Sequence, residues 1–470
     1  MSRPRALAVA AGAALLLGAC AVPRPPAAVD AAAAPQWYAP LPHNGTLADL
    51  NRWWQQFNDP LLLELITAAE AANPNVATAR SRIAQARAAR VAAQAALLPS
   101  MDANVSAARA SQPPTPVATT VTAGAQAAWE IDLFGGNRAA AQAARERLRG
   151  AEAGWHDARV SVAAETANSY LALRTCERQL GVAASDARSR AETARLTQLS
   201  TDAGFTAPAN AALARASAAE AAARATQQRA QCDIEVKGLV ALTGLAEPRL
   251  RERLGAAWVE PAEFAMIAVP PIPAQLLAQR PDVYQAELEV AAASADVGSA
   301  RAQQFPRLSL TGSIARGKAR VGGETIDVES WSIGPLALTL PIFDAGRRAA
   351  EVDAAQARYE EAVELYRARV RQAVREVEEA LVNLESARAR SADALAAVEG
   401  YRASFLAAEA RWRSGLGSLI ELEDQRRALL ASETALVSLQ RERVASWIAL
   451  YRAVGGGWTR DEPEQRTASQ

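Results

Sequence analysis

The sequence predicts a mainly α-helical protein, built as a tandem duplication, whose few strands belong to a membrane β-barrel. Pro74 and Pro99 bracket a helix-like stretch that recurs between Pro281 and Pro306, at a constant offset of 207 residues. In both halves, strand-like segments and then long proline-free stretches follow. A repeat this long excludes solenoids, whose periods are about 20–50 residues. Further along the two halves, the matched pairs are Phe134 with Phe343, Gly204 with Gly415, and Gly244 with Gly455.

Composition excludes several functions. Half of the 470 residues are hydrophobic but only 5% are aromatic, so much of the apolar share is alanine, which favours long, closely packed helices. The formal net charge of zero gives no reason to expect a nucleic-acid partner. His43 and His156 lie far apart and form no metal-ligand pattern. With no phosphate loop and no nucleophile motif, we expect neither an enzyme nor a bound cofactor or metal.

The first residues have the layout of a secretory signal. Arg3 and Arg5 precede the apolar run Ala6–Leu17, which is too short to span a membrane as a mature helix. The run closes on a Leu-Gly-Ala-Cys sequence that resembles the lipobox of bacterial lipoproteins, in which Cys20 becomes the acylated first residue. The alternative is an ordinary signal with a chance cysteine. Ala21 stands where lipoproteins kept in the inner membrane have Asp, which indicates the outer membrane, and the Pro- and Ala-rich tract after it is typical of a tether.

Each half is expected to hold a helical hairpin. Asn137–Thr201 and Gly346–Arg413 contain no proline, and each is followed by a short glycine-containing break. A second helix then runs to Gly244 in the first half and to Gly455 in the second. Glycine supplies the left-handed conformation at a helix end, so the breaks near Gly204 and Gly415 are interpreted as hairpin tips. The alternative is a kink in one longer rod, which the matching positions argue against.

The cysteine spacing agrees with this hairpin. Cys176 lies 28 residues before Gly204 and Cys232 lies 28 residues after it, so an antiparallel pair folded there brings both thiols to one height. An oxidising compartment outside the cytoplasm would permit a disulfide. Two buried free thiols are the open alternative, because equal height does not fix the facing direction.

Four segments ahead of the long helices alternate in polarity and are expected to be strands: Met101–Arg109, Gly124–Phe134, Arg307–Arg316 and Ser332–Phe343. Each has about the 9–11 residues that a tilted strand needs to cross a bilayer. Soluble hairpins are the alternative. Four strands cannot close a barrel, and an open sheet edge cannot face hydrocarbon because its backbone groups would lack partners. If these strands span a membrane, several copies of the chain must therefore combine.

At this point the sequence resembles the bacterial outer-membrane factors of the TolC and OprM type, in particular the NodT-like efflux lipoproteins. The motifs that carry the resemblance are Trp53-Trp54 with Phe57-Asn58-Asp59-Pro60, Trp129 to Gly135, Arg280-Pro281-Asp282-Val283, Pro341 to Asp344, and Gly455 to Trp458. The resemblance implies a homotrimer with a twelve-stranded barrel, continued by a periplasmic α-helical barrel. It also implies an equatorial belt formed by Pro40–Pro60, Ala246–Pro273 and the C-terminal tail.

The expected organisation is a signal peptide at 1–19, a lipid-anchored tether and equatorial segment at 20–60, a first repeat at 61–245, an equatorial linker at 246–273, a second repeat at 274–455 and a tail at 456–470. In the family, residues of the second hairpin tip hold the tunnel shut. By resemblance, Ile420, Asp424 and Arg427 form this aperture, and their spacing places them on one helix face. Glu423 stands where the family has leucine, and Gln425-Arg426 where it has Ala-Gln, so the ion pairs are expected to differ. A merely solvated charged face is the alternative.

The resemblance implies a passive outer-membrane duct for drugs or other small molecules. Its partners would be a periplasmic adaptor protein, an inner-membrane transporter of the RND type, and the lipid of the outer membrane. Two alternatives remain at this stage: the duct of a type I protein secretion system, and a periplasmic structural lipoprotein without a pore. The second leaves the four strand-like segments unexplained.

Overall fold

The computed structural model describes residues 22–31, 37–39, 53–55, 57–112, 115–255, 277, 279–458 and 460. The chain divides into two compact units, each assembled from separate stretches of sequence. The sheet unit comprises the described residues of Met1–Ala32, Arg80–Gly154 and Tyr284–Arg369. The hairpin unit comprises those of Ala33–Ala79, Trp155–Val283 and Val370–Gln470. Within the described residues, no helix combines the length and apolar character needed to cross a lipid bilayer.

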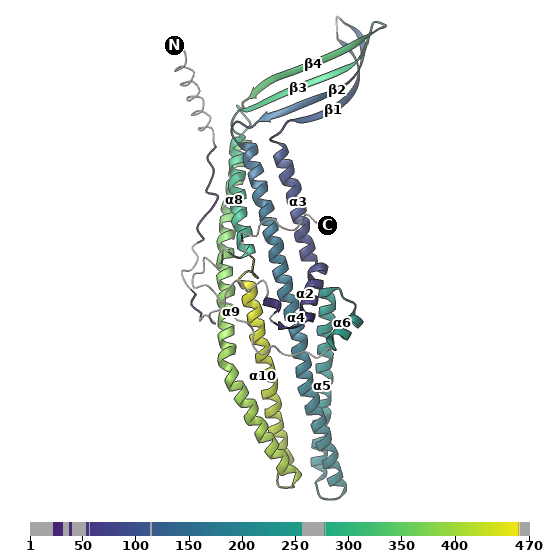
Figure 1. Cartoon of the computed structure of the whole chain (residues 1–470), viewed down its shortest axis with the longest axis vertical. Helices are drawn as coiled ribbons and strands as arrows, with labels where there is room; N and C mark the ends of the chain where they lie inside the picture. Colours follow the sequence, from purple (N-terminus) through teal and green to yellow (C-terminus); the bar gives the residue numbers. More distant parts are fainter. Residues whose placement is uncertain are drawn as a thin grey trace. The chain divides into compact units, whose positions relative to one another are not determined.

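Both halves of the chain contain a helix, two strands and two long helices in the same order (Figure 1). The first half contains α2 (Pro60–Ala72), α3 (Pro74–Ala95), β1 (Ser100–Gln112), β2 (Thr115–Ile131), α4 (Gly136–Asp202), α5 (Pro208–Thr243) and α6 (Glu247–Leu254). The second contains α8 (Pro281–Ala302), β3 (Arg307–Val321), β4 (Glu324–Thr339), α9 (Arg347–Arg413) and α10 (Leu419–Ala453). Helices α4 and α9 both have 67 residues, and both α3 and α8 begin at a proline, which is favoured at the first helical position.

One antiparallel sheet of four strands, in the order β1-β2-β3-β4, forms the strand part of the sheet unit. Its strands have 13 to 17 residues and are longer than expected. Most residues between the two expected strands of each pair are also paired, so the expected bounds were too narrow. These Thr- and Val-containing stretches extend the ladders, because β-branched side chains fit a pleated strand. Conversely, Leu133 and Phe134 lie beyond β2, and Pro341 to Phe343 lie beyond β4.

The two faces of the sheet differ in chemistry. Directly paired residues share a face, so the register assigns Met101, Trp129, Leu310, Ile314 and Trp331 to one side. Met101, Ile314 and Trp331 are 65–77% exposed on this apolar face. The other face carries small and polar side chains, and hydroxyl pairs link its strands, with Ser106 to Thr122 and Ser313 to Ser332 both at 2.9 Å.

The composition of residues 22–31 suggested a tether, but the structure shows this segment bound within the sheet unit. Main-chain carbonyls of this segment accept hydrogen bonds within the sheet unit: Pro23 from Arg301 at 2.7 Å, Pro25 from Ser294 at 2.6 Å, and Pro26 from Tyr359 at 3.0 Å. Ser294 is fully buried. The segment, called the strap below, is therefore bound to α8 and α9. Proline favours such an extended course because it fixes φ and leaves the carbonyls free to accept.

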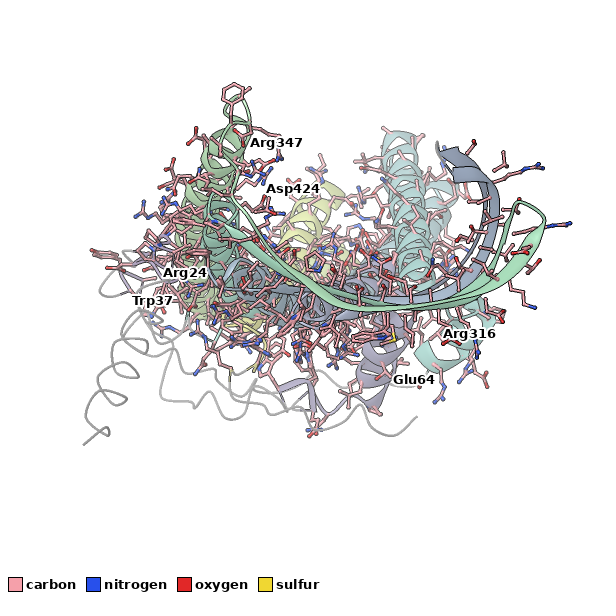
Figure 2. The ribbon with its side chains drawn as sticks, turned by 90° about the horizontal axis from the view of Figure 1, so that it is seen from above. Arg24, Trp37, Glu64, Arg316, Arg347 and Asp424 are labelled. Atoms are coloured by element: carbon pink, nitrogen blue, oxygen red, sulfur yellow. A yellow bond between two sulfur atoms is a disulfide. The ribbon has the colours of Figure 1, made fainter. Side chains whose placement is uncertain are left out.

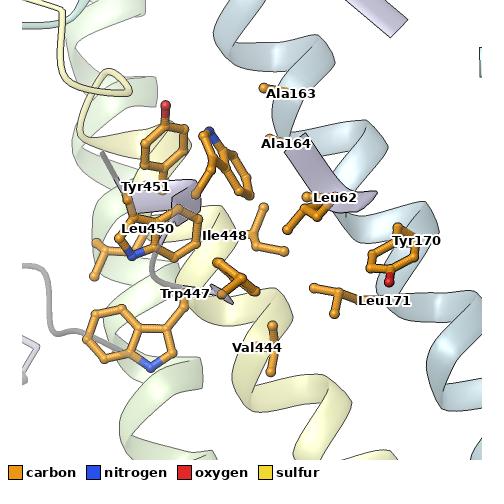
Figure 3. Packing of buried hydrophobic residues seen from close by; sticks show 14 of the residues in the cluster. Leu62, Ala163, Ala164, Tyr170, Leu171, Val444, Trp447, Ile448, Leu450 and Tyr451 are labelled. Atoms are coloured by element: carbon orange, nitrogen blue, oxygen red, sulfur yellow. The ribbon is translucent and has the colours of Figure 1, made fainter. Parts of the chain in front are cut away.

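The hairpin unit has an aromatic core (Figure 3). Trp53 stacks on Tyr451 with ring centroids 4.9 Å apart, and Trp54 meets the same tyrosine edge-on at 4.8 Å. Burial raises the pKa of the Tyr451 phenol to about 12. Next to this core, Asp59 caps α2 by accepting from the amides of Leu61 and Leu62. The Trp-Trp motif thus packs against the end of the second repeat, and the Asp-Pro motif starts the first helix of the first repeat.

Two other motifs, far apart in sequence, also meet in the hairpin unit. Gly455 has φ +90°, and a Cβ placed there would lie 2.3 Å from the carbonyl oxygen of Gln279, so only glycine fits. Next to it, the buried Arg280 donates to the carbonyl of Ala453 at 2.9 Å and pairs with Asp282 and Glu376, both at 2.8 Å. The arginine of the Arg-Pro-Asp motif therefore binds the C-terminal end of α10.

Cys176 and Cys232 are joined by a disulfide with a Cα–Cα distance of 5.5 Å, and it ties α4 to α5. Both cysteines are at least 94% buried. The second hairpin has no counterpart, because no cysteine occurs in that half.

Removing this bond is expected to destabilise the first hairpin. The bond closes a loop of 56 residues, for which the chain-entropy model gives about 4 kcal/mol. Denaturant unfolding of the Cys176→Ser/Cys232→Ser variant, followed by circular dichroism, should therefore have a lower midpoint than the parent protein. A reductant should lower the midpoint of the parent protein and leave that of the variant unchanged. A parent protein that is insensitive to reductant would contradict the prediction.

Candidate functional site

The two hairpin tips have the same backbone design. Gly204 and Gly415 have φ of +82° and +75°, and each ends a long helix. In both tips the following residue closes the helix: the amide of Phe205 donates to the carbonyl of Ser200, and that of Leu416 to Arg411, both at 2.9 Å. This pattern is the glycine-based helix end that the sequence predicted.

The second tip continues into α10 through Ser418, whose hydroxyl accepts from the amide of Glu421 at 3.1 Å. From there α10 presents two different faces. Leu419 and Leu422 are buried against Ala194 and Ala214 of the first hairpin. Further along α10 one face remains buried and the other is exposed to solvent.

The three expected aperture residues lie on the exposed face. Ile420 is 63% exposed, and the side chains of Asp424 and Arg427 are 57% and 69% exposed. Asp424 and Arg427 are brought together at 3.5 Å across one helical turn. Such an exposed pair contributes little to the stability of a single chain. Its carboxylate and guanidinium therefore remain available to groups outside this protomer.

A buried ion cluster lies on the opposite face, and the sequence did not predict it. Arg190 and Arg426 are each 3% exposed, and both donate to the carboxylate of Glu423. Arg190 also forms a bidentate pair with Asp186 at 2.9 and 3.0 Å, and Ser217 donates to Glu423 at 2.7 Å. Residues 186 and 190 belong to α4, 217 to α5, and 423 and 426 to α10. The cluster therefore connects the two hairpins.

The cluster is balanced in charge, with two guanidinium groups and two carboxylates as its buried members. Arg426 donates further to the hydroxyls of Ser189 at 3.0 Å and Thr193 at 3.1 Å, and it lies over the ring of Phe405 at 5.5 Å. Burial lowers the pKa of the Arg426 guanidinium from its usual value. The sequence signal for this cluster was Glu423, which stands where the family has leucine. A carboxylate on an apolar helix face requires a buried cation.

Of the other expected site residues, Cys20 lies outside the part of the chain that the structure describes. No group of His, Cys, Asp and Glu side chains that could hold a metal ion occurs among the described residues.

Glu423→Ala is expected to lower the free energy of unfolding of the hairpin unit by about 3–5 kcal/mol, because it leaves two buried arginines with a single carboxylate. The double variant Glu423→Leu/Arg426→Leu removes one charge of each sign and leaves Arg190 paired with Asp186, so its loss should be smaller. Thermal unfolding followed by circular dichroism measures both. Glu385→Ala, which breaks an exposed pair with Arg388, is the matched control and should change little. Equal effects of Glu423→Ala and the control would argue against a stabilising cluster.

Comparison with known proteins adds the family to this geometry. The family model described as outer membrane efflux protein matches residues 65–245 and 272–456. The pyoverdine export outer membrane protein OpmQ of Pseudomonas aeruginosa is 30% identical over 463 residues, which cover 95% of this chain and 96% of the relative. Nodulation protein T of Rhizobium leguminosarum is 28% identical over 416 residues, which cover 86% of this chain and 88% of the relative.

Among solved structures, the outer-membrane channel OprN has a TM-score of 0.78 and is 28% identical, with 93% of this chain and 98% of that chain covered. The similarity thus extends over both repeats and over sheet and hairpins alike. The chain belongs to the outer membrane efflux protein family.

Proposed function

We propose that this chain is the outer-membrane subunit of a tripartite efflux system, a passive duct that exports drugs or other small molecules. In this proposal a periplasmic adaptor opens the duct, and an inner-membrane transporter of the RND type supplies the energy. The main support is the near-complete alignment with a pyoverdine export protein. Relatives named for solvent and antibiotic efflux align over 86% and 95% of this chain. These names all concern small molecules.

The proposed duct is a homotrimer. Strands β1 and β4 are the two edges of the sheet, and among the described residues each has one side without a partner strand. In the hydrocarbon of a membrane, such an edge leaves backbone N–H and C=O groups unsatisfied at a cost of several kcal/mol each. Pairing β4 of one copy with β1 of the next removes both edges. Three copies then give twelve strands, which lies within the range of known outer-membrane barrels.

The aperture is proposed to include Ile420, Asp424 and Arg427. All three are exposed on α10. The side chains of Asp424 and Arg427 remain more than half exposed although they pair with each other. Around a threefold axis they would form an apolar ring and a charged ring one turn apart. The charged ring would hold neighbouring tips together through ion pairs.

Asp424→Ala and Arg427→Ala are each expected to increase single-channel conductance in planar bilayers, because either change removes one partner of these ion pairs. The same variants should admit antibiotics that the parent channel excludes from cells. Glu192→Ala is the matched control, since Glu192 and Arg195 form an exposed pair of the same kind on α4, and it should leave conductance unchanged. Parent-like conductance and exclusion in both α10 variants would refute the assignment.

Cys20 is proposed to carry the lipid. Replacing it by Ser should abolish the incorporation of labelled palmitate, because no thiol would remain at the expected first mature residue. The Cys176→Ser/Cys232→Ser variant should be labelled like the parent protein. Labelled palmitate on the Cys20→Ser protein would show that Cys20 is not the acylation site.

A further inference from the structure

The apolar face of the sheet ends in a group of cations. Along β3 the residues on this face are first Leu308, Leu310 and Ile314, and then Arg316, Lys318 and Arg320. The three cations occupy successive positions on the same side, and all are exposed. The change from apolar to cationic side chains is therefore abrupt and confined to one end of the strand.

The neighbouring strands add one cation and two carboxylates to this group. Arg109 of β1 lies in the same row as Arg320, with Thr119 of β2 between them. Arg316 pairs with Glu329 of β4 at 2.7 Å, and both side chains remain more than 65% exposed. Asp327 lies opposite Lys318. Four cations thus face two carboxylates on this part of the sheet, which leaves a positive surface with unused donors. It is called the cationic patch below and consists of Arg109, Arg316, Lys318 and Arg320.

The patch lies at the end of the sheet remote from the helices. Helices α3, α4, α8 and α9 all join the strands at the end where Ile131 pairs with Leu308 and Arg307 with Thr339. The patch lies next to the opposite end, where Gly322 and Gly323 form the turn from β3 to β4. Because the helical part of this family lies in the periplasm, the patch is near the outer surface of the outer membrane.

Height along the strand agrees with a position at the lipid headgroups. At about 3.4 Å per residue and a tilt of about 40°, Arg316 lies roughly 20 Å above Leu308, and Arg320 roughly 30 Å above it. The outward apolar band of an outer-membrane barrel is about 25 Å tall. The patch therefore spans the level at which the hydrocarbon ends, with Arg316 just below this level and Arg320 above it. It lies on the lipid-facing side, since it shares the face of the exposed apolar residues, and Figure 2 shows Arg316 on the convex side of the curved sheet.

We propose that the cationic patch binds the phosphate groups of lipopolysaccharide in the outer leaflet. Arg and Lys are the side chains that bind phosphate, and Arg does so with two parallel hydrogen bonds. Basic groups at the level of the headgroups attract anionic lipids. The outer leaflet of this membrane presents phosphorylated lipid A at that level. The proposal rests on the outer-membrane location and not on the cargo or the partners of the duct.

The test measures the binding of diphosphoryl lipid A to the purified, detergent-solubilised protein by native mass spectrometry. Lys318→Gln/Arg320→Gln should weaken binding roughly 30-fold at low salt, because each cation near the surface contributes about fivefold. Asp327→Asn removes an anion from the same surface and should strengthen binding. Circular dichroism establishes that the variants are folded.

Two lipid controls decide the ligand. Lipid A without phosphates should bind the parent protein no more tightly than it binds the double variant. Phosphatidylglycerol should bind the parent protein more weakly than diphosphoryl lipid A does. Unchanged affinity in the double variant, or weaker binding by Asp327→Asn, would overturn the proposal. Equal binding of phosphatidylglycerol and lipid A would also overturn it, because the patch would then be a general anion surface.

Discussion

The architecture of this molecule depends on the unpaired backbone groups at the two edges of its four-stranded sheet. In the proposed duct the apolar face of the four-stranded sheet lies against lipid, yet lipid cannot surround the edge strands of that sheet. In the proposed homotrimer, neighbouring copies of the chain supply the missing hydrogen bonds, so the membrane part would exist only as an assembly. The duplication fits this requirement, because each half contributes one strand pair and one long helix leaving it. An edge strand therefore comes from each half of the chain.

Charge is used differently in the two units. On the sheet, cations are exposed and concentrated on one face near the turns, where they can act on surrounding molecules. In the hairpin unit, the cluster around Glu423 buries its charges and pairs them between helices of both halves. Buried pairs of this kind add little net stability, but they penalise any arrangement that separates the partners. The cluster therefore specifies how the hairpins pack more than how strongly they do so.

Much of the helical design could be predicted from the sequence, because prolines and glycines act locally. Pro74 and Pro281 start helices, and Gly204 and Gly415 end them, whatever lies around. The strand ends were missed because a Thr-rich stretch is compatible with a loop and with a strand. Whether it forms a strand depends on pairing with the neighbouring strand. The cluster around Arg190 and Glu423 was missed for a related reason: helical spacing reveals which residues share a face, but not which helix that face meets. That Ile420, Asp424 and Arg427 share one helix face followed from their spacing, whereas the choice of these three residues came from the family resemblance.

The strap was the clearest failure of composition as a guide, and the cause lies in how it is bound. The groups that hold it in place are the carbonyls of Pro23, Pro25 and Pro26, which accept from Arg301, Ser294 and Tyr359. A carbonyl is present in every amino acid, so this recognition demands an extended course but few particular side chains. The amino acids of the strap can therefore change during evolution while the strap stays bound to α8 and α9. Related proteins should then retain the three donors on the helices more faithfully than the segment they hold.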